Sequence, residues 1–245
     1  MGRNLILGDV HGRIKALSDV LGKMDFNPDE DTLYAVGDYI DRGESSLSVL
    51  RYLSSLPHFK GVIGNHDIFL ESWLYSGKAD DEWLDEYDGK KTEKEFDKTK
   101  KKEKRKIALF LKRLPIALFE EKYIVVHSGP PEGRNEADMR LYSKVARPEV
   151  YDKNGIYPDI TPLVDRSYFL SAYSKMDPSF RKGTYPVVPP LDTGKRIFVG
   201  HTPIPSAVPF ISEEYHLVAL DTGAGHDERL TLMDMDTLEY VQSNR

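Results

Sequence analysis

Short apolar runs alternate with amphipathic stretches along the first quarter of the chain. Each run holds four or five mostly apolar residues and is followed by turn-forming residues, which is typical of buried strands. Between the runs, apolar residues recur every three or four positions, as in helices that pack one face on a core. The predicted strands are Asn4–Leu7, Thr32–Val36 and Lys60–Ile63, and the predicted helices are Arg13–Met24 and Ser45–Leu56. Repeated strand–helix units predict an α/β sheet whose strands end at a common edge.

The pattern changes after a further predicted helix at Phe69–Tyr75. Asp80–Asp88 holds six acidic residues, and Lys98–Lys106 holds seven basic ones. We interpret residues 77–106 as a charged insertion. It is either a solvated, partly helical surface or a lid or docking surface for an acidic partner. An apolar stripe at residues 107–114 then returns the chain to the core.

The second half of the chain begins with a predicted hairpin, Ala117–Glu120 with Tyr123–Val126. Residues 128–194 have poor periodicity and nine prolines. Because long irregular stretches in compact domains are often functional, we interpret this region as an irregular cap over the carboxyl edge of the sheet. The remaining predicted strands are Arg196–Val199, Leu217–Leu220, Leu230–Met235 and Glu239–Val241. No repeat or linker divides the chain, so we expect one domain over residues 1–245.

Composition narrows the class of protein. A chain of 245 residues with 40% apolar content can fill the core of one large domain. The net charge of −6 disfavours a general nucleic-acid binder, which is normally basic. The lack of cysteine excludes disulfides and thiolate metal sites. We see no signal peptide and no apolar run of the ~18 residues that a spanning helix needs, so we expect a cytoplasmic protein without membrane contact.

A polar cluster follows each of five apolar runs. Any one of these residues alone would fit a turn or a satisfied core histidine, but the shared setting points to one site. The set mixes imidazole and oxygen donors without sulfur, which suits manganese, iron(II) or zinc better than calcium. Asp38 could bridge two ions about 3.5–4 Å apart, which would hold a bridging hydroxide for attack on phosphorus. The candidate metal ligands are Asp9, His11, Asp38, Asn65, His127 and His201.

Three further residues are candidates for catalysis. His66 stands beside Asn65, and we expect it to act as a general acid on the leaving-group oxygen rather than as a ligand. Asp41 is its expected orienting partner, because a carboxylate fixes the imidazole tautomer. Arg42 offers a planar fork of donors that matches phosphate oxygens. His226 follows the turn at 222–225 and could approach the site, but we interpret it as a loop histidine.

Five motifs together resemble the metallophosphoesterase superfamily. They are GDVHG at 8–12, GDYIDRG at 37–43, GNHD at 64–67, the histidine that ends VVH at 125–127, and GHTP at 200–203. More narrowly, they are similar to the phosphoprotein phosphatase branch. That branch includes bacterial and phage Ser/Thr phosphatases and the symmetrical diadenosine tetraphosphatases. The stretch LDTGA at 220–224 extends the resemblance.

The resemblance implies a single calcineurin-like domain folded as a four-layer α/β/β/α sandwich. It also implies two divalent metal ions, usually manganese in bacterial members, with iron or zinc as alternatives. By motif position, Asp9, His11 and Asp38 would hold the first ion. Asp38, Asn65, His127 and His201 would hold the second.

The chain departs from the family pattern at two points. GNHD replaces the commoner GNHE, at a position that is not a ligand. GHTP lacks the second histidine of the GHxH found in nuclease and phosphodiesterase relatives, which disfavours those activities. The family's second phosphate-binding arginine has three candidates here, namely Arg140, Arg147 and Arg166.

The function expected from the resemblance is metal-dependent hydrolysis of phosphate esters. The first reading is a Ser/Thr-type protein phosphatase or phosphomonoesterase, which acts on a phosphorylated protein, a peptide or a small phosphate ester. The alternative is a symmetrical bis(5'-nucleosyl)-tetraphosphatase, and the third is a non-catalytic metal-binding scaffold. A nucleotide enzyme could stack bases on cap aromatics, which could equally pack the cap itself. These aromatics are Tyr142, Tyr151, Tyr157, Tyr168, Phe169, Tyr173 and Tyr185.

Overall fold

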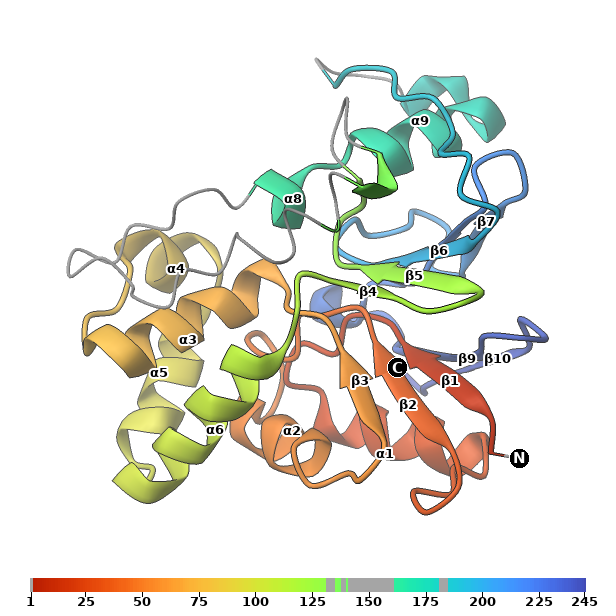
Figure 1. Cartoon of the computed structure of the whole chain (residues 1–245). Helices are drawn as coiled ribbons and strands as arrows, with labels where there is room; N and C mark the ends of the chain where they lie inside the picture. The colour runs from red at the N-terminus through yellow and green to blue at the C-terminus, as the bar shows by residue number, and fades with distance from the viewer. Residues whose placement is uncertain (1, 131–134, 138–139, 141–160, 181–184) are drawn as a thin grey trace.

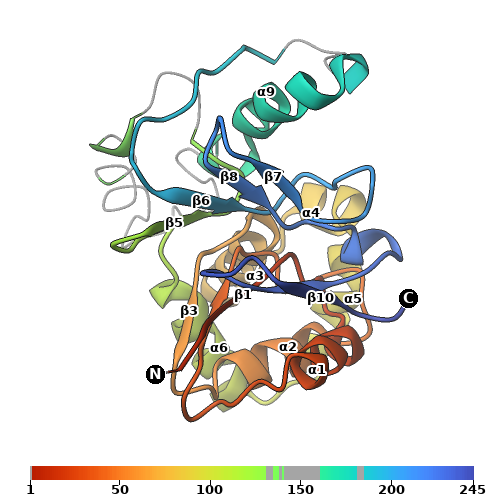
Figure 2. The ribbon, with the colours of Figure 1, turned by 90° about the vertical axis from the view of Figure 1, so that its right-hand side faces the viewer.

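The computed structural model describes residues 2–130, 135–137, 140, 161–180 and 185–245. Within these residues, two five-stranded sheets face each other (Figure 1). Helices cover the outer face of each sheet, as the rotated view shows (Figure 2). The layer order is therefore helix, sheet, sheet, helix, which confirms the predicted four-layer α/β/β/α sandwich.

The first sheet contains all three strands predicted near the N-terminus. β1, β2 and β3 are parallel, with Leu7 opposite Ala35 at the carboxyl edge of the β1–β2 pair. The two C-terminal strands extend this sheet in the antiparallel sense, with β9 paired to β1. In spatial order the strands are β10 (Tyr240–Gln242), β9 (Thr231–Asp234), β1 (Asn4–Leu7), β2 (Thr32–Ala35) and β3 (Phe59–Gly61).

Two helices connect the parallel strands of the first sheet, as predicted. α1 (Ile14–Lys23) buries Leu17, Val20 and Leu21, which lie on one face at helical spacing. Ser45 is the N-cap of α2 (Ser46–Leu53), and its side chain accepts a hydrogen bond from the Ser48 amide. Both helices thereby cover the outer face of the sheet, and they leave its carboxyl edge free for the polar motifs.

The second sheet brings together segments that are far apart in sequence. β5, β6 and β8 are parallel, and β4 and β7 pair with them in the antiparallel sense. The short edge strand β7 was not predicted. In spatial order the strands are β4 (Ala117–Phe119), β5 (Tyr123–Val126), β6 (Arg196–Val199), β8 (Leu217–Ala219) and β7 (Phe210–Ser212).

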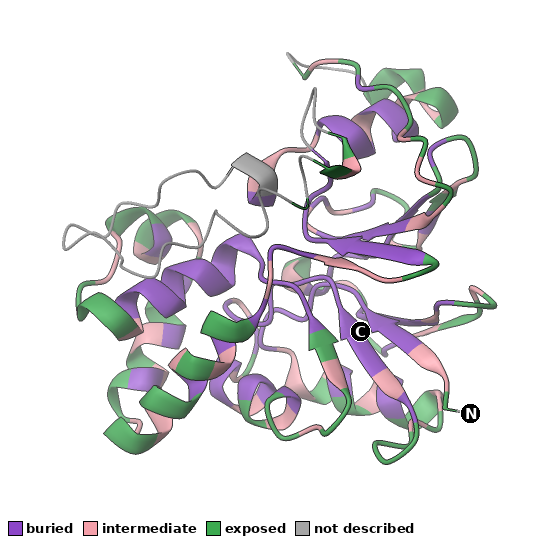
Figure 3. Cartoon of the chain, in the orientation of Figure 1, coloured by how far each residue is buried: buried purple, intermediate pink, exposed green. Residues whose placement is uncertain are grey.

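Alternation along the strands divides the core into layers. In β1, Leu5 and Leu7 face the helices, whereas Ile6 faces the other sheet. Phe198 and Val218 of the second sheet meet Ile6 in this middle layer. The inner strands of both sheets are buried along most of their length, whereas the edge strands β3, β4, β7 and β10 are partly exposed (Figure 3). Such double-sided burial explains why the inner strands read in the sequence as continuous apolar runs.

The charged insertion folds into helices beside the first sheet. α3 (Asn65–Ser76) is followed by α4 (Asp81–Glu86), α5 (Gly89–Asp97) and α6 (Lys101–Arg113). Its helical character agrees with the prediction, and its charged side chains are mostly exposed. Trp83 and Phe96 are nevertheless fully buried in the core that α2 and α3 share. The insertion is therefore packed against the domain as well as solvated.

The described part of the cap contains a regular helix that the sequence pattern did not indicate. α8 (Thr161–Val164) leads into α9 (Ser167–Met176), which covers the outer face of the second sheet. Phe169 stacks on Tyr173, and both contact Phe210 of β7. Phe169 and Tyr173 therefore pack the cap itself. Three other cap aromatics, Tyr142, Tyr151 and Tyr157, lie outside the described residues. Among the described helices, none has the length and apolar character needed to cross a bilayer.

Candidate metal centre and acid pair

The proposed ligands meet where the carboxyl edges of the two sheets face each other. Asp9 and His11 follow β1, Asp38 follows β2, and Asn65 opens α3. His127 follows β5 and His201 follows β6, so the second sheet supplies two histidines. All six side chains are buried except that of His201, which is partly exposed.

The backbone turns sharply at several of these positions. His11, Asp38 and His201 adopt φ values of 45°, 51° and 66°, which non-glycine residues rarely adopt. Asp41 and Arg42 follow with 70° and 66°. Such conformations cost about 1–3 kcal/mol each and persist where the surroundings enforce them, often at functional sites.

Asp67 fixes the loops that make these turns. Its buried carboxylate accepts hydrogen bonds from the amides of Asp38, Tyr39 and Gly64 at 2.8, 2.9 and 2.9 Å. The loop after β2 is thereby bound to the start of α3. The Asp38 carbonyl in turn accepts from the amide of His11 at 2.9 Å, which joins the loop after β1.

Two glycines allow the ligand loops to approach one another. A Cβ at Gly64 would lie 2.1 Å from Oδ1 of Asp38. One at Gly200 would lie 2.0 Å from Oδ1 of Asp9. Any side chain at either position would displace a proposed ligand, which gives a physical reason for the glycines of GNHD and GHTP.

Asp38 lies between two groups of donors. Its Oδ2 is 3.8 Å from Nε2 of His11 and 3.4 Å from Nε2 of His127. Asn65 Oδ1 lies 3.0 Å from Nε2 of His127 and 3.0 Å from Nδ1 of His201. Asp38 thus belongs to two clusters whose donor atoms all lie within 4.8 Å of one another, His11–Asp38–His66 and Asp38–His127–His201. The first cluster contains His66 and not the proposed ligand Asp9, whose Oδ2 accepts from the amide of His201 at 2.9 Å. Asp38 is the carboxylate that the two clusters share, as a bridging ligand requires.

The electrostatics of the cluster favour the binding of a cation. Oδ1 of Asp9 is buried and has no hydrogen-bond partner among the described residues. Burial and the nearby Asp221 raise the pKa of Asp9 well above its usual value. Although burial opposes the charged form, Asp38 and Asp9 raise the pKa of His127 to about 10. A cation among these groups would neutralise the carboxylates and hold the imidazoles in their neutral form.

His66 and Asp41 form a buried pair beside the ligands. Nδ1 of His66 lies 2.7 Å from Oδ2 of Asp41, and Nε2 lies 3.3 Å from Nη2 of Arg42. Because a guanidinium only donates, Nε2 of His66 must accept its hydrogen bond. Nδ1 of His66 therefore carries the proton and donates a hydrogen bond to Asp41. The backbone amide of His66 donates to Oδ1 of Asp38 at 3.1 Å. The acid pair and the shared ligand are therefore one connected unit.

Arg42 stands where the acid pair meets the ligands. Its Nη1 lies 3.2 Å from Nε2 of His11 and 3.3 Å from Nε2 of His226. Burial and the charge of Arg42 lower the pKa of His226. Of the two interpretations of His226, the structure therefore favours the one in which the turn at 222–225 brings it to the site.

The three candidate arginines have different surroundings. Nε of Arg140 donates to Glu136 at 2.8 Å, and its guanidinium covers the ring of Phe119, away from the ligands. Arg147 lies outside the described residues. Arg166 directly precedes α9, and its charge contributes to lowering the pKa of His201 and His226, after the larger effect of burial. Arg166 is thus the described candidate that lies near the site.

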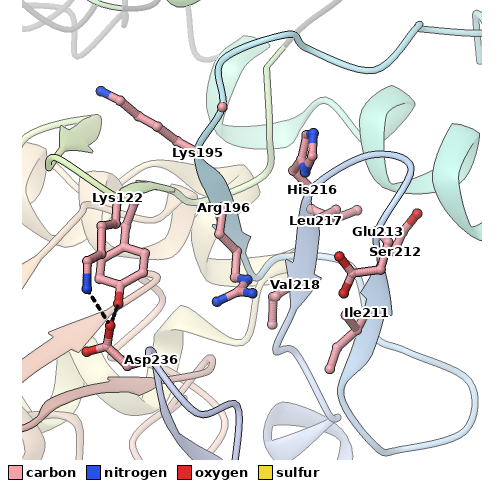
Figure 4. Close-up of a pocket in the computed structure, with 12 residues that line it drawn as sticks. Lys122, Lys195, Arg196, Ile211, Ser212, Glu213, His216, Leu217, Val218 and Asp236 are labelled. Atoms are coloured by element: carbon pink, nitrogen blue, oxygen red, sulfur yellow. Dashed lines mark hydrogen bonds and ion pairs between the residues drawn. The ribbon is translucent and has the colours of Figure 1, made fainter.

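A cavity of about 480 Å³ opens beside Arg42. Arg13, Lys90 and Lys91 line it together with three aspartates. A second pocket, of about 240 Å³, is lined by residues near the amino ends of β5, β6 and β8, such as Arg196 (Figure 4). It lies at the opposite edge from the proposed ligands, so the cavity beside Arg42 is the one that adjoins the candidate site.

A family model and several known proteins are similar to this chain. A family model described as calcineurin-like phosphoesterase matches residues 2–224. A symmetrical bis(5'-nucleosyl)-tetraphosphatase of Yersinia enterocolitica is 47% identical over 73 residues, which cover 29% of this chain and 25% of that protein. The same enzyme of Pectobacterium atrosepticum is 34% identical over 127 residues, 51% of this chain and 42% of that protein. The chain thus spans less than half the length of these relatives.

Solved structures share the fold at low sequence identity. A cold-active protein-tyrosine phosphatase of a psychrophilic Shewanella species superposes with a TM-score of 0.63 at 15% identity, covering 100% of this chain and 81% of that one. A protein serine/threonine phosphatase of Saccharomyces cerevisiae gives 0.52 at 16% identity, covering 99% and 79%. At these identities the likeness concerns the fold alone.

Proposed function

The chain belongs to the calcineurin-like phosphoesterase family, and from this premise we propose that it hydrolyses phosphate esters with two divalent cations. The observation that carries the proposal is the position of Asp38, which is shared by two clusters of donors. The unpartnered, buried Oδ1 of Asp9 supports it, because a carboxylate oxygen is rarely left without a partner unless a cation takes that place.

We assign Asp9, His11 and Asp38 to one ion, and Asp38, Asn65, His127 and His201 to the other. The donor set of imidazole, carboxylate and amide oxygens accommodates manganese, iron or zinc, and we propose manganese because the family resemblance implies it. When bound, such ions supply an activated water at neutral pH and stabilise the charge that develops on phosphorus.

The remaining residues of the site act on the substrate itself. Arg42 presents its donor fork toward the space between the acid pair and the ligands, where it would orient the phosphoryl oxygens. In its doubly protonated form, His66 would give the Nε2 proton to the leaving-group oxygen, and Asp41 at Nδ1 would hold the ring in position. Arg166 is the proposed second phosphate-binding arginine.

Two substrate classes fit this site. The first is a phosphomonoester, such as a phosphorylated protein, a peptide or a small phosphate ester. The second is a dinucleoside tetraphosphate, which the names of the sequence relatives favour. The cavity beside Arg42 does not separate the two classes, because Arg13 pairs with Asp227 and Lys90 with Asp85 within its lining. A non-catalytic scaffold is disfavoured, since His66, Asp41 and Arg42 are all present and connected.

A substrate panel tests the proposal. The purified chain is stripped with a chelator, reloaded with manganese, iron(II) or zinc, and assayed on p-nitrophenyl phosphate, phosphoserine and phosphothreonine peptides, and diadenosine tetraphosphate. We expect metal-dependent release of phosphate or of ADP. If the folded, metal-loaded chain turns over none of them, the chain is a non-catalytic metal-binding scaffold and the proposal is wrong.

A further inference from the structure

The charged insertion sends two side chains to the carboxylate of the acid pair. Nε1 of Trp83, on α4, donates to Oδ2 of Asp41 at 2.8 Å. Oγ1 of Thr92, on α5, donates to Oδ1 of Asp41 at 2.5 Å. Trp83 is 0% exposed and Thr92 1% exposed, so both bonds are shielded from water. Neither residue belongs to a motif of the candidate site.

These donors fix the orientation of Asp41. Its Oδ2 accepts hydrogen bonds from His66 and Trp83, and its Oδ1 accepts one from Thr92. Three donors directed at one carboxylate fix the plane in which its oxygens lie. Because His66 follows Oδ2 through a 2.7 Å contact, the imidazole is oriented through the same bonds.

A closed ring of hydrogen bonds fixes the direction of the Thr92 hydroxyl. The Asp41 amide donates to Oγ of Ser46 at 2.9 Å, and Ser46 lies 2.8 Å from Oγ1 of Thr92. Because the Thr92 hydroxyl donates its hydrogen bond to Asp41, the Ser46 hydroxyl must donate to Oγ1 of Thr92. Backbone, serine, threonine and carboxylate thus form one cycle, in which the loss of the threonine hydroxyl breaks two bonds.

The insertion is fastened to the same loop at further points. Lys91 of α5 donates to the carbonyl of Gly43. Glu95, one turn later, accepts from the hydroxyl of Ser45 and, at 3.1 Å, from the amide of Leu47. Because these residues follow Asp41 and Arg42 directly, α5 holds the loop that carries both.

The turn between α4 and α5 completes the enclosure. The ring of Tyr87 meets that of His66 edge to face, with centroids 5.3 Å apart. A Cβ at Gly89 would lie 2.5 Å from the indole of Trp83, so only glycine lets α5 start against this ring. The placement of Trp83 therefore depends on the local sequence of the insertion.

We propose that Trp83 and Thr92 are positioning residues of the acid pair, and that the insertion at 77–106 exists to deliver them to Asp41. This inference rests on the proposed function, because it assigns a purpose to the orientation of His66. It adds a requirement for catalysis to a segment whose sequence indicates only surface charge.

The test compares substrates that need a proton on the leaving group with one that does not. p-Nitrophenolate leaves as a stable anion, whereas the serine alkoxide of a phosphopeptide must be protonated. We expect Thr92→Val and Trp83→Phe to lower kcat on phosphoserine peptides by about 10- to 100-fold, the usual effect of residues that orient a reacting group, with KM little changed. The loss on p-nitrophenyl phosphate should be much smaller, and Thr92→Ser should restore the rate.

Matched controls separate positioning from packing. Thr99→Val removes a hydroxyl that bonds the Glu95 carbonyl just beyond the same helix. Trp73→Phe removes the indole that packs on Trp83 at 6.0 Å without contacting Asp41. Both controls should keep the wild-type ratio of rates on the two substrates. Equal losses on both substrates in Thr92→Val and Trp83→Phe would instead show a structural role and overturn the proposal.

A measurement without turnover tests the hydrogen bonds to Asp41 separately from the proposed function. The chain has two tryptophans, so the spectrum of the ¹⁵N-labelled, metal-free protein should show two indole signals. We expect the signal lost in Trp83→Phe to exchange slowly and to shift in Thr92→Val and Asp41→Asn, but not in Thr99→Val. If the chemical shift of the Trp83 indole does not change in Asp41→Asn, the hydrogen bond from Trp83 to Asp41 is contradicted. Lack of turnover by the wild-type chain would refute the proposed function alone.

Discussion

The ligand side and the acid side of the candidate site are built in different ways. On the ligand side, residues from four strand ends in two sheets meet with the first residue of α3. On the acid side, one loop and the start of α3 carry Arg42, Asp41 and His66, and two helices of the insertion support them. The parallel strands of each sheet position the first set, whereas hydrogen bonds between side chains position the second.

This difference teaches which part of the chain each half of the site depends on. The ligand side requires both sheets, because His127 and His201 come from the second. The acid side is complete within the first hundred residues. Substitutions should therefore separate metal binding from proton transfer, and the size of the effect should follow how many groups each residue connects.

Asp38→Asn should have the largest effect, because Asp38 belongs to both donor clusters. An amide is neutral and has one oxygen where the carboxylate has two, so it cannot bridge two ions in the same way and attracts each of them less. We expect both ions to be lost and turnover to fall to background, with metal content measured by elemental analysis. Retention of one full equivalent of metal would contradict the bridging role.

His66→Asn should act on the acid side alone. We expect turnover of alkyl phosphates to fall by roughly 10²- to 10⁴-fold, the usual scale of general acid catalysis. Metal content should stay near that of the wild type, since Nδ1 of His66 is held by Asp41. A parallel loss of metal would erase the distinction between the two sides and make His66 a ligand.

Arg166→Ala should sharpen the comparison at the entrance to the site. A charge-assisted hydrogen bond contributes about 1.5–3 kcal/mol, so inhibition by free phosphate should weaken by about 10-fold or more. Arg140→Ala is the matched control, because Arg140 pairs with Glu136 away from the ligands. Equal phosphate inhibition in the two variants would remove Arg166 from the site.

Asp31→Asn should have the smallest effect, and only on stability. Although burial opposes ionisation, hydrogen bonds from Arg3 and from the Asn27 amide lower the pKa of Asp31 from 3.8 to about 2. A lowered pKa stabilises the fold above about pH 4, and this contribution is lost as the pH falls toward 2. With Arg3 39% exposed, we expect a loss of about 1 kcal/mol at pH 7.

Urea unfolding at pH 7 and near pH 2 measures this difference between Asp31→Asn and the wild type. The difference should vanish at the lower pH, and activity per folded molecule should be unchanged at pH 7. A loss of activity in this variant would mean that a change in stability far from the site lowers turnover. The activity losses of the other variants could then no longer be assigned to the site alone.

Much of the ligand side could be predicted from the sequence, because apolar runs mark buried strands and ligands follow strand ends. Asp9, Asp38 and His127 are each found one to three residues beyond a predicted strand, and the structure brings them together. The supports of the acid side could not be predicted. Trp83 and Thr92 lie in a charged helical segment, and only packing of α4 and α5 on α2 and α3 directs them to Asp41.

The C-terminal strands have a consequence for how the chain is made. β1 is synthesised more than two hundred residues before its neighbour β9. Until β9 emerges from the ribosome, one side of β1 presents unpaired amides and carbonyls that another strand could pair with. Nascent chains should therefore rely on chaperones until Thr231–Asp234 has emerged, and truncation before Thr231 should yield aggregates in place of an active fragment.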